Sequence, residues 1–134
     1  MSESERCGVV LVVDDHEALA RSLVSLLGAS GFDAQAVHTG TEAVAFVRSH
    51  ASVALMLLDM SLPDMSGVEV LRALRVPGGS QHLPPVVMFS ADDDPATHEE
   101  LTQLGVVSFV SKTNPGGLLQ VVALHARPTK PRPA

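Results

Sequence analysis

The chain has 134 residues, about the length of one domain, and 46% of them are hydrophobic, which excludes disorder over most of its length. It has 15 Asp and Glu against nine Lys and Arg, and three of those nine cations lie in the last eight residues. An acidic body with no Trp, no Tyr and four Phe lacks the cationic stripe and the stacking surfaces that nucleic acid requires, so we expect no direct nucleic-acid binding.

The N-terminal region carries no targeting signal of the common kinds. Residues 1–6 are acidic rather than basic, and the short apolar run Val9–Val13 ends at two aspartates, so it fits neither a signal peptide nor a membrane span. The single cysteine, Cys7, cannot form an internal disulfide, which is typical of a reducing compartment. We therefore expect a cytoplasmic protein without a membrane partner.

Five short apolar runs alternate with helical patterns along the chain. Most of them are continuously apolar, which is typical of strands buried on both faces. Strand and helix alternating in this way predict a doubly wound α/β fold, with a parallel sheet in the order 2-1-3-4-5 and helices on both faces. The predicted strands are Val9–Val13, Ala34–Val37, Val53–Leu58, 86–89 and 106–110.

Capping residues and apolar periodicity predict five helices between and after these runs. The signals, in chain order, are an apolar face from Leu19 to Leu27 before Gly31, the capping box Thr39 and Glu42, the face Val68, Leu71 and Leu74, and the pairs Asp94–Pro95 and Asn114–Pro115. Residues 76–85 are rich in proline and glycine and predict a loop. We assign residues 1–126 to one domain and residues 127–134, which alternate proline with basic residues, to a disordered tail or the start of a linker.

Four of the five apolar runs end in a polar side chain capable of chemistry. Asp14 and Asp15 follow the first run, Asp59 the third, Ser90 the fourth and Lys112 the fifth. The carboxyl ends of strands in an open parallel sheet converge on the crevice where ligands bind. We therefore expect these five side chains to face one pocket.

This set of residues favours phosphoryl transfer with magnesium. Carboxylates held close together repel one another unless a cation offsets them, and Mg²⁺ accepts one or two carboxylates while keeping positions for water and a phosphate oxygen. An ionised aspartate needs no general base, so Asp59 could attack phosphorus and become an aspartyl phosphate. Lys112 would pair with the transferred phosphoryl group and the Ser90 hydroxyl would donate to another of its oxygens.

From Val9 to about Ala126 the chain resembles the receiver domain of bacterial two-component response regulators, of the single-domain chemotaxis type. The most specific element is LLDMSLPDMSG at residues 57–67, which is similar to the family's phosphoacceptor aspartate and the loop with Pro and Gly that follows it. The acidic pair, the Ser90–Ala91 pair, and Phe109 three residues before Lys112 also match the family's order and spacing. The resemblance implies a flavodoxin-like fold and a signalling switch rather than an enzyme acting on a metabolite.

The resemblance also implies roles at the site. Asp59 would take a phosphoryl group from a phosphohistidine on a sensor histidine kinase or a phosphotransfer protein, with Lys112 at the phosphoryl group. Asp15 would bind Mg²⁺ directly, Asp14 mostly through water, and Asp59 and the backbone carbonyl of Ser61 would complete the protein ligands. The chain would catalyse only its own phosphorylation and dephosphorylation.

A second implied feature is a switch that changes a partner-binding face. Phosphorylation would draw Ser90 inward, and Phe109, in the place of the family's switch aromatic, would rotate to follow it. The family usually has proline after the lysine, whereas Thr113 follows Lys112 here. The downstream target of the switch is not indicated by the sequence.

Three alternatives stay open at this point. Asp15 could be only a cap for the helix that begins near His16. A phosphatase of the haloacid dehalogenase type also uses a strand-end aspartate and magnesium, but it needs a second aspartate where Ser61 stands. A receiver-like protein interaction module that is never phosphorylated is the main rival, although its acidic cluster is usually degraded.

Overall fold

The computed structural model describes residues 8–49, 53–75, 84–90, 95–112 and 115–126, and it describes no side chain for Ser90, 95–97 or Pro115. The predicted caps Asp94 and Asn114, most of the predicted loop 76–85 and the predicted tail 127–134 lie outside these residues. Those assignments, and the domain boundary at residue 126, stay predictions.

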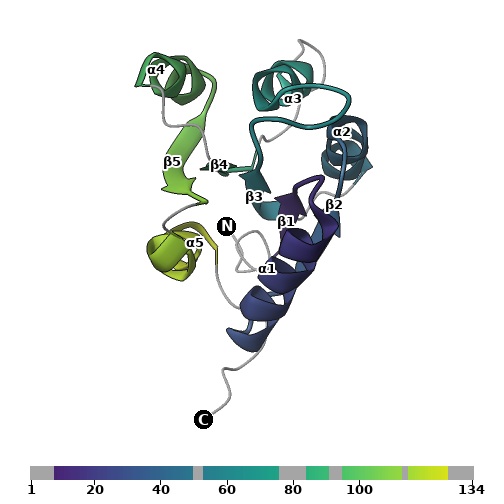
Figure 1. Ribbon diagram of the computed structural model, residues 1–134, viewed down its shortest axis with the longest axis vertical. Coiled ribbons are helices and arrows are strands. Elements are labelled where there is room, and N and C mark those ends of the chain that lie inside the picture. The colour runs from purple at the N-terminus through teal and green to yellow at the C-terminus, as the bar shows by residue number, and fades with distance from the viewer. Residues whose placement is uncertain (1–7, 50–52, 76–83, 91–94, 113–114, 127–134) are drawn as a thin grey trace.

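The described chain forms one parallel five-stranded sheet in the order β2-β1-β3-β4-β5 (Figure 1). The predicted strand order is thus confirmed. All four pairings are parallel, and Val13 of β1 lies level with Leu58 of β3 at the ends of the two strands. The strands are β1 (Val9–Val13), β2 (Ala34–Val37), β3 (Val53–Leu58), β4 (Val86–Ser90) and β5 (Val106–Ser111).

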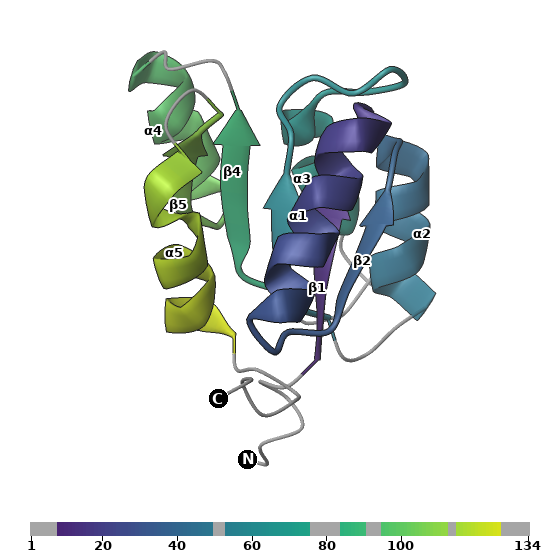
Figure 2. The same ribbon diagram turned by 60° about the horizontal axis from the view of Figure 1, so that its bottom comes forward.

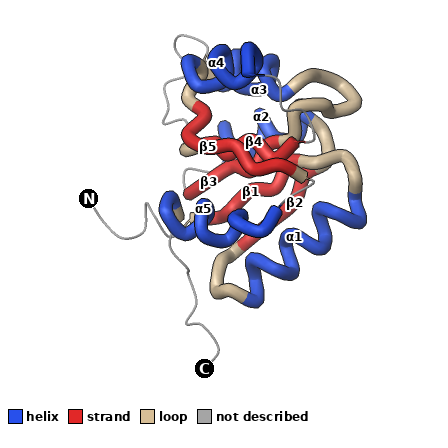
Figure 3. Tube along the Cα trace, turned by 60° about the vertical axis from the view of Figure 1, so that its left-hand side comes forward, coloured by secondary structure: helices blue, strands red, loops and turns tan. Residues whose placement is uncertain are grey.

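Helices cover both faces of the sheet (Figure 2). On one face lie α1 (Glu17–Ala29) and α5 (Leu118–His125), and on the other lie α2 (Gly40–Ser49), α3 (Gly67–Leu74) and α4 (Pro95–Gln103) (Figure 3). Within the described part of the chain, none of the helices has both the length and the apolar run that crossing a bilayer requires.

Each central strand contributes to two hydrophobic cores, one on each face of the sheet. Val10 and Val12 of β1 belong to the core under α1 and α5, whereas Leu11 and Val13 belong to the core under α2, α3 and α4. All four side chains are at most 1% exposed. Because alternate side chains of a strand point to opposite faces, a strand covered on both faces must be apolar throughout, which explains its continuous run. The edge strand β2 is less buried, in keeping with its weaker apolar pattern.

Among the described residues, the helix ends agree with the sequence signals except at two points. The Thr39 hydroxyl accepts a hydrogen bond from the Glu42 amide as predicted, but the Glu42 carboxylate accepts from the His38 amide rather than from Thr39. Pro115 begins a short 3₁₀ helix (Pro115–Gly117), so α5 starts at Leu118, later than the proline signal predicted. Two successive glycines disfavour α-helix, which accounts for the delay.

Candidate functional site

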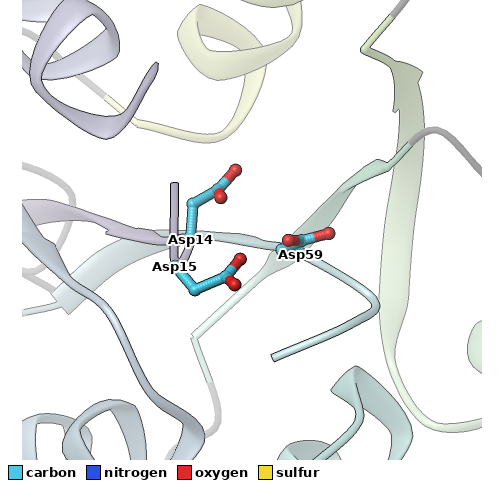
Figure 4. Close-up of side chains that lie close together, drawn as sticks. All are labelled: Asp14, Asp15 and Asp59. Carbon is cyan, nitrogen blue, oxygen red and sulfur yellow. The ribbon is translucent and has the colours of Figure 1, made fainter. Parts of the chain in front are cut away.

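Three aspartates meet at the carboxyl ends of β1 and β3. The Asp59 amide donates to the Val13 carbonyl at 3.0 Å, which continues the pairing of the two strands past their ends. One carboxylate oxygen from each of Asp14, Asp15 and Asp59 lies within 4.8 Å of the others. Figure 4 shows the three side chains side by side. Asp14 and Asp59 are 1% and 7% exposed, whereas Asp15 faces solvent, so the cluster is buried on one side and open on the other.

Lys112 reaches this cluster from the end of β5. Its Nζ lies 2.8 Å from Asp14 Oδ2 and 3.2 Å from Asp59 Oδ2, and its side chain is only 21% exposed. The contact with the buried Asp14 Oδ2 is an ion pair whose alignment falls short of a hydrogen bond. The sheet therefore brings together the four charged residues that the sequence singled out, with three carboxylates sharing one ammonium.

The pKa shifts follow from this imbalance of charge. Burial raises the pKa of Asp59 above its usual value, and the Asp14 charge adds to the increase, while Lys112 opposes it. Burial alone would lower the pKa of Lys112, but its contact with Asp14 and the charges of Asp59 and Asp14 outweigh burial and raise it. The ammonium is held charged, and the pocket keeps an excess of negative charge.

The donor set fits a hard divalent cation. Every candidate ligand atom is a carboxylate or carbonyl oxygen, the type that Mg²⁺ prefers. The exposed Asp15 leaves one side of the cluster open to the waters that Mg²⁺ retains. The Asp14 Oδ2 atom, whose contact with Lys112 is poorly aligned, keeps acceptor capacity.

The loop after Asp59 folds back tightly on the strand end. The Gly67 amide donates to the Met60 carbonyl at 2.7 Å, and a Cβ at Gly67 would lie 3.0 Å from the backbone oxygen of Asp59. Only glycine permits that approach without a shift. The Ser61 amide lies 3.5 Å from Asp59 Oδ1, so Ser61 begins the loop beside the carboxylate, as the proposed carbonyl ligand would require.

The two predicted switch residues lie on the neighbouring strands. Ser90 ends β4 and pairs with Ser111 of β5, but its side chain lies outside the described residues, as does Thr113. The Phe109 ring stacks on the His98 ring of α4, with centroids 4.0 Å apart and planes 9° from parallel. Phe109 therefore links β5 to α4 in this conformation.

The alternative that Asp15 merely caps α1 is wrong. The N-cap of α1 is His16, and no side chain caps that end of the helix. The Asp14 carboxylate instead accepts a hydrogen bond from the His16 amide at 2.9 Å. Asp15 therefore does not cap α1.

Sequence reasoning missed two contacts around the site. His38 Nδ1 lies 3.0 Å from the Asp14 backbone oxygen, to which it donates, and Asp64 accepts three hydrogen bonds from the start of α2. Both contacts join residues more than 20 positions apart, so no local pattern marks them. Asp64 does lie inside the 57–67 motif, which was the one available signal.

The response regulator receiver domain model matches residues 10–123, and the chain therefore belongs to this family. The DNA-binding response regulator MtrA of Mycobacterium tuberculosis is 41% identical over 85 residues, which are 63% of this chain and 35% of that protein. The sensory transduction protein RegX3 of Mycolicibacterium smegmatis is 39% identical over 104 residues, 77% of this chain and 43% of that protein. The chain thus spans less than half the length of these two relatives, and DNA binding is stated in the name of MtrA alone.

Solved structures of receiver domains have the same fold. The activated N-terminal receiver domain of RstA from Klebsiella pneumoniae superposes with a TM-score of 0.77 at 26% identity, over 89% of this chain and 98% of that one. A response regulator receiver protein from Pseudomonas putida gives a TM-score of 0.77 at 26% identity, over 87% and 95% of the two chains. Receiver domains are signalling switches that interact with histidine kinases or phosphotransfer proteins and bind Mg²⁺ at an acidic pocket. The aspartate cluster lies where such a pocket is expected.

Proposed function

We propose that this chain is a phosphoacceptor switch of a two-component phosphorelay, with Asp59 as the acceptor. The observation that supports this most strongly is the position of Lys112, whose ammonium contacts Asp14 and Asp59 in the same pocket as Asp15. A half-buried lysine against two carboxylates is expected where a transferred phosphoryl group must later be held.

The proposed reaction uses Asp59 as the nucleophile. A carboxylate oxygen forms a bond to phosphorus while the phosphorus–nitrogen bond of a phosphohistidine breaks, and the imidazole leaves with that electron pair. Lys112 opposes the increase that burial causes in the pKa of Asp59, and it therefore favours the ionised carboxylate, which can attack without a general base. After transfer, the same ammonium pairs with a phosphoryl oxygen, and the Ser90 hydroxyl donates to another.

Asp14, Asp15, Asp59 and the carbonyl of Ser61 would hold a magnesium ion. When bound, the ion supplies positive charge that offsets the negative charge of the phosphoryl oxygens. Asp15 is the exposed member of the cluster, and we assign it direct contact with the ion, with Asp14 acting mostly through water. The buried Asp14 also orients Lys112 through their ion pair.

The output of the switch would pass through Phe109. Its ring packs on His98 of α4, so a rotation of Phe109 toward the site would break that stack and alter the surface around α4, β5 and α5. We propose a cytoplasmic location, a sensor histidine kinase or phosphotransfer protein as phosphoryl donor, and no direct contact with nucleic acid by these residues.

Incubation with acetyl phosphate and Mg²⁺, followed by intact-mass measurement, tests the proposal. We expect one phosphoryl adduct on the wild-type chain and none on Asp59→Asn, while Asp33→Asn, the same change at an exposed aspartate outside the cluster, behaves as wild type. No adduct on the wild type would favour a phosphorylation-independent interaction module. Steady hydrolysis of unrelated phosphate esters would favour a phosphatase.

A further inference from the structure

The first residues of α2 are hydrogen-bonded to Asp64, which lies in the loop that follows Asp59. One Asp64 carboxylate oxygen accepts from the Gly40 amide at 2.8 Å, and the other accepts from the Thr41 amide at 2.9 Å and the Thr41 hydroxyl at 2.6 Å. The first amides of a helix have no partner within the helix, and the helix dipole favours a negative charge there. A side chain of the loop thus supplies the partner that a local cap would otherwise supply.

His38, just before this helix, is hydrogen-bonded to Asp14 of the acidic pair. The His38 ring donates to the Asp14 carbonyl at 3.0 Å, and the His38 amide donates to the Glu42 carboxylate at 2.9 Å. Residues 38–42 therefore contact both the end of β1, which carries Asp14, and the loop that follows Asp59. This segment is a bridge between the two chain segments that supply the carboxylates.

Backbone contacts within the loop connect Asp64 to the turn that begins with Ser61. Ser61 and Ser66 form an antiparallel bridge, and the Leu62 amide donates to the Met65 carbonyl at 3.2 Å. A Cβ added at Gly40 would overlap the Met65 side chain, so loop and helix are in close contact next to Asp64. A movement of Asp64 would shift the turn that begins with Ser61.

We propose that Asp64 is a positioning residue for the magnesium and phosphoacceptor site, acting by holding the 59–67 loop, and with it Ser61, against the bridge formed by residues 38–42. This inference rests on the proposed function and assigns a role to a residue outside the proposed set of magnesium ligands and phosphoryl-binding groups.

The charge state of Asp64 is compatible with that role. Its hydrogen bonds with the Thr41 side chain and with the amides of Gly40 and Thr41 lower its pKa to about 2. The carboxylate is thus ionised over the whole neutral range, so the contact does not change with pH there.

Magnesium titration followed by amide NMR shifts tests the role of Asp64 without any measurement of activity. Asp64→Ala removes all three hydrogen bonds, and we expect its Mg²⁺ affinity to fall about 10-fold, the lower end of the effect seen when outer partners of metal ligands are removed. Asp64→Asn keeps one acceptor oxygen and should recover part of that loss. Thr41→Ala, which removes the hydroxyl hydrogen bond to Asp64 and leaves the two amide bonds, should cause a loss of a few-fold and serves if Asp64→Ala does not fold.

Thr102→Ala is the matched control for Thr41→Ala, because it removes an exposed threonine hydroxyl that donates to the His98 carbonyl within α4, outside both the loop and residues 38–42. We expect this variant to bind Mg²⁺ as wild type does. Wild-type affinity in Asp64→Ala and in Thr41→Ala would overturn the inference and leave the proposed function standing. A wild-type chain that binds no Mg²⁺ would overturn both.

Discussion

Replacing Asp59 by asparagine should stabilise the metal-free protein at neutral pH. Asparagine has nearly the same shape as aspartate but carries no charge, so the substitution removes one of the three carboxylates of the cluster and leaves the ion pair between Lys112 and Asp14 in place. A residue that only supports the fold would lose stability on the same substitution.

The size of the effect follows from the distances in the site. At an effective dielectric constant of about 20, the attraction between Asp59 and Lys112 at 3.2 Å is about 5 kcal/mol. The carboxylate oxygens lie within 4.8 Å of one another, so the repulsion is about 3.5 kcal/mol or more for a buried partner such as Asp14 and less for the exposed Asp15. The attraction by Lys112 and the repulsion by the other aspartates nearly cancel, so the net effect of the Asp59 charge on stability is the free-energy cost of burying it. We expect Asp59→Asn to gain about 1 to 2 kcal/mol, or a rise in Tm of about 3 to 8 °C.

Thermal unfolding followed by circular dichroism measures this gain, with Asp33→Asn as the control. Because the pKa of Asp59 is raised, its ionisation lowers stability as pH increases through the folded-state pKa. The advantage of Asp59→Asn should therefore be complete at neutral pH and absent below the ordinary value of 3.8, where Asp59 is protonated in both states. A Tm at neutral pH equal to or below that of Asp33→Asn would refute this account of the electrostatics.

Three further predictions concern the loop and the helices around the site. Gly67→Ala should destabilise the chain by about 1 to 3 kcal/mol in chemical denaturation, since its Cβ would meet the Asp59 backbone oxygen at 3.0 Å; an unchanged midpoint would contradict the close approach. The Arg72–Glu100 ion pair joins α3 to α4 at 2.6 Å, but both side chains are exposed. A double-mutant cycle with alanine should therefore give a coupling free energy of only about 0.2 to 1 kcal/mol, and this coupling should be lost in high salt. A coupling that persists in 1 M salt, where the screening length is about 3 Å, would contradict this prediction. The Asp64 carboxyl should titrate with a pKa of about 2 when followed by carbon NMR. Because this pKa is lowered in the folded state, the ionised carboxylate should stabilise the protein above the unfolded-state pKa, and this stabilisation should be lost as pH falls through the folded-state pKa. Titration of Asp64 near 4, the ordinary value, would show that the bonds to α2 do not form in solution.

The sheet could be predicted from the sequence because each of its strands is marked by a pattern within its own few residues. Strands covered on both faces need continuous apolar runs, and the runs 53–58 and 9–13 coincide with β3 and β1. Since parallel strands end at one edge of the sheet, the convergence of Asp14, Asp59 and Lys112 followed from the strand ends alone. These parts needed no knowledge of long-range side-chain contacts.

Other features could not be predicted because they depend on how separate loops meet. The contacts of Asp64 with Gly40 and of His38 with Asp14 each span 24 residues. The first arises where the start of α2 meets the loop after β3, and the second where the chain leaves β2 beside the end of β1. The capping box of α3 was a missed local signal, since Ser66 and Glu69 have the required spacing and form both hydrogen bonds.

Chemical mapping of the phosphorylated residue tests the central claim most directly. After incubation with acetyl phosphate and Mg²⁺, borohydride reduction converts an aspartyl phosphate to the corresponding alcohol, which peptide mass spectrometry assigns to a single position. We predict that the label lies on Asp59 alone and that it is absent when Mg²⁺ is removed by a chelator. A label on Asp14, Asp15 or Asp64, or labelling that does not depend on Mg²⁺, would contradict the assignment of Asp59 as the phosphoacceptor.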